Sequence, residues 1–222
     1  MRQCTTGIRA CRIQWDILPG RRVLRGAMST DSVGSGPIPG RECGECTACC
    51  VHPAIDSDEL QKLPGVKCAH LDESNRCGIY ERRPQVCRSF YCGWRILPWL
   101  TDEWRPDKSG VMIRFAREEI PAQYKSRISF DLGLIGALDA AQTTAFATLI
   151  ANLIAQGIPT FISVPGPPGH VAGKTFLNDV LAPIVKTRDL NAVKKAISGA
   201  VESSVNHRKE KVILRPRAGL RP

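Results

Sequence analysis

Eight cysteines between residues 43 and 92 constrain this 222-residue chain more than any other feature. They are Cys43, Cys46, Cys49, Cys50, Cys68, Cys77, Cys87 and Cys92. The first four follow the pattern C-x2-C-x2-CC, and a two-residue gap lets one tight turn carry both thiols on the same side. Gly44 favours the first such turn because glycine accepts backbone angles that other residues resist. The pattern therefore predicts thiol ligands that converge on metal, with the later cysteines closing the site.

Whether the chain is exported or stays in the cytoplasm decides whether these thiols form disulfides or bind metal. The first 27 residues contain no apolar run of the length that a secretory signal needs. The longest apolar stretch, around 145–154, contains Thr and Asn and is too short to span a bilayer. We therefore expect a cytoplasmic protein without a membrane partner, in which clustered cysteines serve metal or redox chemistry. Structural disulfides or a buried thiol cluster are the alternative.

Two kinds of metal centre suit eight thiols. Two tetrahedral zinc sites would use four cysteines each, but such sites usually come as two C-x2-C pairs. Here only the N-terminal part of the pattern contains such pairs. Three closely spaced cysteines with a distant fourth are typical of iron–sulfur ligation. We therefore favour an iron–sulfur cluster and keep zinc as the alternative, with the remaining cysteines holding a second metal or supporting the first.

The surroundings of Cys87 favour a thiolate. Pro84 suits the start of a short helix over 85–90, which places Cys87 near free backbone amides. Arg83 and Arg88 lie close to it in the sequence. Because both a helix start and a cation favour the ionised form, we expect the pKa of Cys87 to lie below its ordinary value. The alternative is that the two arginines are simply surface charges.

Histidines and tryptophans also accompany the cysteines. His52 and His70 could each supply a nitrogen ligand, but with eight thiols present we expect them behind the ligands or at the surface. Trp94, Trp99 and Trp104 recur every five residues after the last cysteine. They can shield a cluster from solvent, form a small core or present a partner surface.

The net charge of +10 resides in the two ends of the chain. Residues 1–27 carry six arginines and one aspartate, and residues 206–222 carry six basic residues and one glutamate. The other 19 basic and 19 acidic residues cancel. Basic ends attract acidic surfaces weakly and without sequence preference, so a protein partner is compatible with them and nucleic acid is not expected.

Composition divides the chain into four parts. We expect a disordered leader and linker over 1–42, a cysteine-cluster metal-binding module over 43–105, an α+β region over 106–205 and a basic tail over 206–222. Met28 is followed by Ser-Thr-Asp, so we expect it to be the natural start, with residues 1–27 an extension of the reading frame.

Hydrophobic spacing predicts an α+β fold with about three strands and three helices behind a small irregular module. The strands are expected over 111–115, 126–134 and 159–164. The helices are expected over 137–156, 176–184 with a disturbance at Pro183, and 190–201. A capped short helix is also expected within the cysteine module, over 56–60.

The segment Gly169-His-Val-Ala-Gly-Lys-Thr175 resembles a phosphate-binding loop but is one residue short of it. No later apolar strand ending in Asp supplies a magnesium partner. We therefore expect a Pro/Gly turn here, with a helix beginning at Thr175.

Together the cysteines and their neighbours resemble a known family. The C-x2-C-x2-CC run, Cys68, the segment 77–80 (Cys-Gly-Ile-Tyr) and the segment 83–92 (Arg-Pro-x2-Cys-Arg-x-Phe-x-Cys) are similar to the YkgJ-type cysteine-cluster family, also called the CxxCxxCC or zinc- or iron-chelating domain. All eight cysteines find a counterpart, over about 43–95. The resemblance implies a metal-binding domain. It implies no activity for residues 96–222.

Three functions follow from these observations. The first is a metal-binding protein, with an iron–sulfur cluster or zinc, in electron transfer, redox sensing or metal handling. The second is a zinc-stapled interaction module that docks on a protein partner. The third is an iron–sulfur enzyme that acts with the α+β region, although no catalytic motif identifies a substrate site there.

Overall fold

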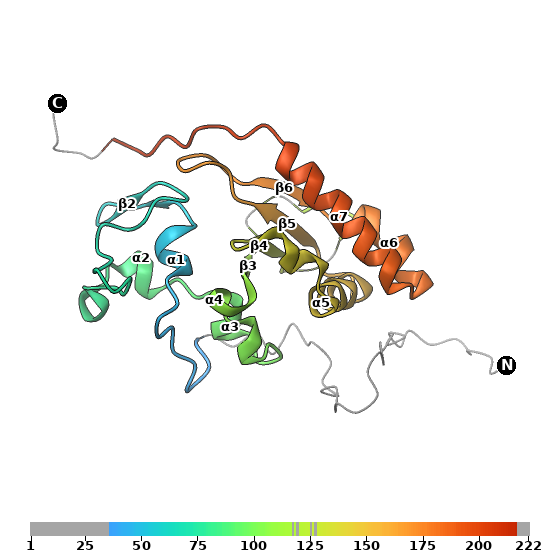
Figure 1. The fold of residues 1–222 in the computed structure, drawn as a ribbon, viewed down its shortest axis with the longest axis horizontal. Helices are drawn as coiled ribbons and strands as arrows, with labels where there is room; N and C mark the ends of the chain where they lie inside the picture. The colour runs from blue at the N-terminus through green and yellow to red at the C-terminus, as the bar shows by residue number, and fades with distance from the viewer. Residues whose placement is uncertain (1–35, 117, 119, 125, 127, 217–222) are drawn as a thin grey trace.

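The computed structural model describes residues 36–216 except 117, 119, 125 and 127 (Figure 1). The expected extension over 1–27, with Cys4 and Cys11, lies outside the described residues, as do residues 28–35 and the last six residues of the tail. Within the described part of the chain, no helix is both long and apolar enough to cross a membrane.

The cysteine region is built from short elements at one end of the molecule (Figure 1). They are α1 (Ala48–Val51), β1 (Ile55–Asp56), β2 (Gln61–Lys62), the 3-10 helix η2 (Tyr80–Arg82) and α2 (Gln85–Arg88). The short helix predicted from Pro84 to Phe90 is present as α2, but Pro84 is its N-cap rather than its first residue and the helix ends at Arg88.

The helix expected over 56–60 is wrong, because β1 and β2 form an antiparallel hairpin there. Ser57 closes the hairpin loop: its backbone N–H donates to the Leu60 carbonyl at 3.0 Å, and its hydroxyl accepts from the Leu60 N–H at 3.1 Å. Five residues form little more than one helical turn, which is too short to be stable without packing.

Three short elements link this region to the body of the protein. They are α3 (Gly93–Ile96), the 3-10 helix η3 (Asp102–Trp104) and α4 (Pro106–Ser109). Trp94 is buried in the main hydrophobic core, and Trp99 and Trp104 pack against it. The expected module boundary at residue 105 stays a prediction.

A four-stranded mixed sheet forms the centre of the body, in the order β3-β4-β5-β6. The strands are β3 (Val111–Phe115), β4 (Phe130–Leu134), β5 (Thr160–Val164) and β6 (Gly173–Phe176). The pair β4/β5 is parallel and the two outer pairs are antiparallel. The α+β class is confirmed. The strand β6 was not predicted, because Gly173 to Thr175 was interpreted as a turn and helix start.

The body contains four helices after β4. They are the 3-10 helix η4 (Leu138–Gln142), α5 (Thr144–Ala155), α6 (Asn178–Thr187) and α7 (Leu190–Asn206). The helix predicted over 137–156 divides at Thr143, whose hydroxyl caps α5 by accepting from the Phe146 N–H at 3.2 Å. Gly157, at φ 70°, follows the end of α5. The helix α6 continues through Pro183.

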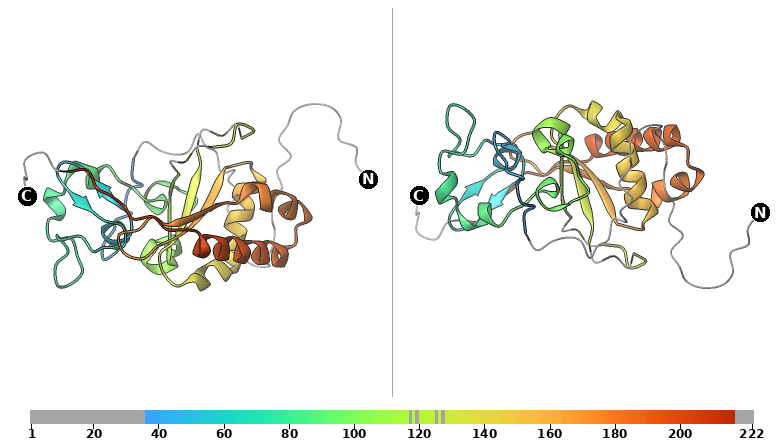
Figure 2. Two further views of the ribbon diagram at one scale, coloured as in Figure 1. Left: turned by 90° about the horizontal axis from the view of Figure 1, so that it is seen from above. Right: turned by 90° about the horizontal axis from the view of Figure 1, so that it is seen from below.

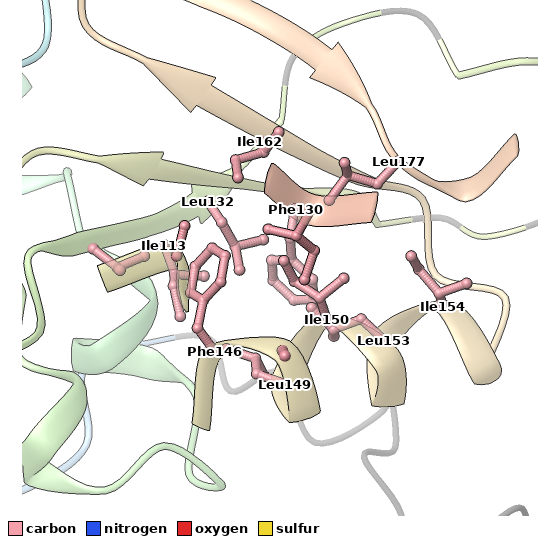
Figure 3. Packing of buried hydrophobic residues seen from close by; sticks show 14 of the residues in the cluster. Ile113, Phe130, Leu132, Phe146, Leu149, Ile150, Leu153, Ile154, Ile162 and Leu177 are labelled. Carbon is pink, nitrogen blue, oxygen red and sulfur yellow. The ribbon is translucent and has the colours of Figure 1, made fainter. Parts of the chain in front are cut away.

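One face of the sheet carries the core (Figure 3). Strand side chains alternate between faces, so Ile113, Leu132 and Ile162 point to the same side and meet α5. Phe146 and Ile150 of α5 are fully buried against them. The apolar faces of α6 and α7 continue the same cluster. On the opposite face, Arg114 and Ser163 line a cavity together with His52 of the cysteine region.

The segment after α7 returns along the molecule toward the cysteine region (Figure 2). Val212 N–H donates to the Gly169 carbonyl at 2.8 Å, which fastens the segment to the β5–β6 loop. Farther on, Gln61 of β2 donates to the Arg215 carbonyl at 2.6 Å, and the Arg215 guanidinium lies 3.2 Å from the Asp56 carboxylate. The described part of the basic tail therefore contacts the β1–β2 hairpin.

We expect Asp189→Ala to lower the free energy of unfolding by about 1 kcal/mol, the usual contribution of an N-cap. The Asp189 carboxylate accepts from the backbone N–H of Asn191 at 2.9 Å and of Ala192 at 3.1 Å, at the start of α7. Urea unfolding followed by circular dichroism measures the change. Glu202→Ala is the control, because it removes an equal charge from an exposed site on the same helix. Equal losses in both variants would contradict the capping role.

Candidate metal centre

The eight cysteines of the described region are all free thiols, and each is half-buried. Cys43 and Cys46 lie in the loop before α1, and the Cys46 N–H donates to the Cys43 carbonyl at 2.9 Å. Gly44 between them has φ 54°, the left-handed conformation expected of this turn. Cys49 and Cys50 are consecutive residues of α1. The C-x2-C-x2-CC run is therefore a turn that leads into a single helical turn.

The later cysteines return to this run by folding of the chain. The Cys68 N–H donates to the Cys50 carbonyl at 2.9 Å. Cys77 forms an isolated antiparallel bridge with Leu71. Cys87 lies within α2, and Cys92 is the N-cap residue directly before α3.

Burial is the largest influence on the pKa of three of these thiols, Cys46, Cys87 and Cys92. It raises the pKa of Cys46 to about 11 and raises the pKa of Cys92 above its ordinary value. The lowered pKa expected for Cys87 is wrong: burial raises it, and the nearby charges of Cys50, Cys68 and Cys77 raise it further, while Arg83 opposes them only in part. Sequence proximity to arginine was a poor guide because desolvation of the half-buried thiol is the larger effect. Arg88 instead donates to the Gln85 side chain at 3.1 Å.

Cys49 and Cys50 are linked by a hydrogen bond between their side chains. The bond lowers the pKa of Cys50, and Lys62 and Arg83 lower it further. The same bond is the largest cause of the raised pKa of Cys49. The adjacent pair thus retains one proton while the second thiol ionises readily.

Lys62 supplies a buried positive charge beneath α1. Its residue is 5 % exposed, and its ammonium donates to the carbonyls of Val51 at 2.7 Å, Val66 at 3.0 Å and Leu63 at 3.1 Å. Burial lowers the pKa of Lys62, and the charges of Cys68 and Cys50 act in the opposite direction. A cation held this firmly is suited to offset negative charge on neighbouring thiolates.

The donor chemistry fits a thiol-bound metal, whereas the side-chain positions do not yet enclose one. Among the residues that the structure describes, no three His, Cys, Asp or Glu side chains are grouped closely enough to hold an ion. The thiols are nevertheless free, half-buried and accompanied by cations. Thiolates of this kind are ligands for zinc and for iron–sulfur clusters. By donor type, the cysteines are therefore a suitable ligand set.

The two histidines of the cysteine region differ in their exposure to solvent. His70 is exposed. His52 follows α1 and is half-buried, and its Nδ1 atom is buried without a hydrogen-bond partner. Burial is the largest cause of the lowered pKa of His52, and Lys62 and Arg114 also lower it. His52 lies beside a cavity of about 40 Å³ between the cysteine region and the sheet. Such a cavity has room for only a few water molecules.

A charge cluster around one buried carboxylate lies on the sheet face next to this cavity, and sequence reasoning missed it. Asp131 of β4 is 1 % exposed and accepts from Ser163 at 2.7 Å, from Arg114 at 2.9 Å and from Lys174 at 2.9 Å. Lys174 also donates to Glu118. The alternation of side chains along the strands could have shown that these charged residues share one face of the sheet. That inference needed Lys174 to lie in a strand, whereas the sequence from Gly173 to Thr175 was interpreted as a turn and helix start.

The fold and the cysteine geometry together define a cysteine-cluster protein with an attached α+β body. Over 52 residues the chain is 46 % identical to a UPF0153 protein of Pseudomonas aeruginosa, covering 20 % of this chain and 61 % of that relative. Over 52 residues it is 40 % identical to a UPF0153 protein of Vibrio cholerae, covering 20 % of this chain and 62 % of that relative.

The match to these relatives is partial, since the chain spans about three fifths of their length. No family model matches the chain. No solved structure matches it significantly. The similarity therefore concerns a minor part of this chain.

Proposed function

We propose that this chain is a cytoplasmic metal-binding protein whose eight cysteines carry an iron–sulfur cluster, with zinc as the second candidate. The observation that carries the proposal is the set of eight free, half-buried thiols. Two of them, Cys49 and Cys50, lie in α1 near the buried ammonium of Lys62, and the chain at Cys68 is hydrogen-bonded to the Cys50 carbonyl. Similarity to UPF0153 proteins and the YkgJ-type spacing of the cysteines support it.

At two of the thiols, cations oppose the effect of burial on the pKa. The charges of Lys62 and Arg83 favour the ionised form of Cys50, and the charge of Arg95 favours the ionised form of Cys92. Each thiol gives up its proton when it binds a metal, so nearby cations favour binding at neutral pH. A bound iron–sulfur cluster would supply a redox couple, which suits electron transfer or redox sensing. Zinc would cross-link the region and suit a structural or metal-handling role.

We expect the full chain, purified without oxygen, to contain iron and acid-labile sulfide and to absorb broadly near about 400 nm, as thiolate-bound clusters do. Absorption spectra and elemental analysis of the same sample measure this. Zinc in a colourless sample would instead assign the second candidate. Glu45→Gln is the control, because it changes an exposed side chain within the first turn but keeps every thiol.

The variant Cys49→Ser/Cys50→Ser should lose most of the bound metal, since it removes both thiols of α1. A wild-type chain that binds neither iron nor zinc, also after anaerobic reconstitution, would overturn the proposed function.

A further inference from the structure

We propose that the cavity between the cysteine region and the sheet binds a small anion that carries a planar carboxylate group, such as bicarbonate, formate or acetate. The inference goes beyond the proposed function, because it assigns a ligand to a site whose described lining residues include no cysteine. It rests on the walls of the cavity, on the charge of the residues that line it and on one buried nitrogen without a partner.

Three separate parts of the chain enclose the cavity. His52 and the turn at Pro64 and Gly65 form the wall on the side of the cysteine region. The strands β3, β4 and β5 form a second wall, and the β5–β6 loop forms the third. This loop reaches toward the cysteine region (Figure 1), where the Gly169 N–H donates to the Pro64 carbonyl at 2.8 Å. A ligand in the cavity would therefore contact both parts of the molecule at once.

The cavity lies over a position of β4 that has no side chain. Gly133 follows Asp131 by two residues, so both occupy the same face of the sheet. Gly133 pairs with Met112 of β3 and with Ser163 of β5, and all three residues line the cavity. A Cβ atom at Gly133 would lie 3.3 Å from the Ser163 hydroxyl oxygen and would occupy part of this space. The missing side chain thus opens the cavity beside the charge cluster.

The charge of the lining residues favours a negative ligand. Among the described residues that line the cavity, Arg114 carries the one formal charge, and no carboxylate is present. The Nε and Nη2 atoms of Arg114 donate to a single oxygen of Asp131, at 3.1 and 2.9 Å. Its Nη1 atom forms no hydrogen bond with the described residues and remains a donor. A guanidinium is well suited to a carboxylate group, because its planar set of donors matches the two oxygens.

Two further polar groups face the ligand. The Nδ1 atom of His52 is buried and has no hydrogen-bond partner among the described residues. A buried polar atom without a partner is unfavourable, so a ligand oxygen in the cavity would remove this cost. The Ser163 hydroxyl donates to Asp131 at 2.7 Å, which leaves its oxygen free to accept from the hydroxyl group of bicarbonate.

The volume of the cavity limits the size of the ligand. At about 40 Å³ it holds about three or four non-hydrogen atoms, since one water molecule needs roughly 10–15 Å³ of such volume. Bicarbonate, formate and acetate meet this limit, and a nucleotide exceeds it. The segment 169–175, which resembles a phosphate-binding loop in sequence, contributes His170 and Ala172 to the wall and then continues as β6.

The test measures thermal unfolding of the full chain in formate, acetate or bicarbonate, at fixed pH and at an ionic strength held constant with sodium chloride. At least one of the three anions should raise the unfolding midpoint progressively with its concentration, and the anion that does so identifies the ligand. Two compounds are matched controls. Acetamide has the shape of acetate without its charge, and trimethylacetate has the charge but is too bulky. Neither should raise the midpoint.

The variant Gly133→Ala should weaken binding of the anion at least about tenfold, because its methyl group fills part of the cavity. Gly199→Ala is the control, since nothing within 4 Å would meet its added Cβ atom, and it should bind as wild type does. His52→Phe keeps a ring of similar shape but removes the nitrogen, and it should weaken binding about tenfold. If Gly133→Ala does not fold, His52→Phe and the two control compounds still decide the result.

Three results would overturn the proposal: no rise with any of the three anions in wild type, an equal rise with acetamide or trimethylacetate, or undiminished binding in Gly133→Ala or His52→Phe. None of these results concerns the metal content of the chain. A failure of the anion site is therefore distinguishable from a failure of the proposed function, which elemental analysis tests.

Discussion

Gly173→Ala is expected to destabilise the protein by more than about 4 kcal/mol, or to prevent it from folding. A Cβ atom at Gly173 would lie 1.8 Å from the Ser204 carbonyl oxygen and 2.8 Å from its carbon. Both atoms belong to the backbone of α7, so no side-chain rotation relieves the overlap and β6 must separate from the helix. Urea unfolding, together with the yield of folded protein, measures the effect.

Gly199→Ala is the matched control for Gly173→Ala. Gly199 lies in α7, and nothing within 4 Å would meet an added Cβ atom there. Alanine has the higher helix propensity, so this substitution should raise the free energy of unfolding by about 1 kcal/mol. If Gly173→Ala proved as stable as wild type, the close approach of β6 and α7 would be wrong.

Asp131→Asn is expected to lower the free energy of unfolding by about 3 kcal/mol, the lower end of the range for breaking a buried ion pair. The carboxylate is 1 % exposed and faces the cations of Arg114 and Lys174, whose side chains are 29 % and 22 % exposed. Without it, two positive charges remain close together on the sheet face. Their partial exposure to water moderates the loss. Urea unfolding at neutral pH measures the change.

Asp139→Asn is the control for Asp131→Asn, since Asp139 is an exposed carboxylate on η4. It should change stability by no more than about 0.5 kcal/mol. Equal, small effects of both substitutions would show that the charge cluster contributes little. A second variant, Lys174→Met, should be milder than Asp131→Asn, because Arg114 still pairs with the carboxylate.

The body of the fold was largely predictable because its apolar residues repeat with the periods of strands and helices. The strand Val111–Phe115 and the start of α7 at Leu190 agree with the prediction. The strand β6 was missed because its four residues include Gly173 and Lys174 and show no apolar alternation. Its place depends on pairing with β5 and on contact with α7, which are long-range effects.

In the cysteine region, too, the features set by local sequence were predictable and those set by distant contacts were not. The free thiols and the left-handed turn at Gly44 follow from residue types and short spacings. The ionisation of Cys87 does not, because it depends on burial and on thiols up to 37 residues away in the sequence, at Cys50. The helix expected over 56–60 failed because two short segments could pair as a hairpin instead.

By itself, the sequence determined the class of this protein: an α+β body with a dense set of thiols suited to metal. Local spacing suffices for that, since periodicity and C-x2-C gaps act over a few residues. Only the tertiary structure decided which distant groups are neighbours. It joined Cys92 to the segment before Cys43, placed Cys68 on Cys50, and brought Lys174 to Asp131. These contacts form where the chain folds back on itself, and no local pattern encodes them.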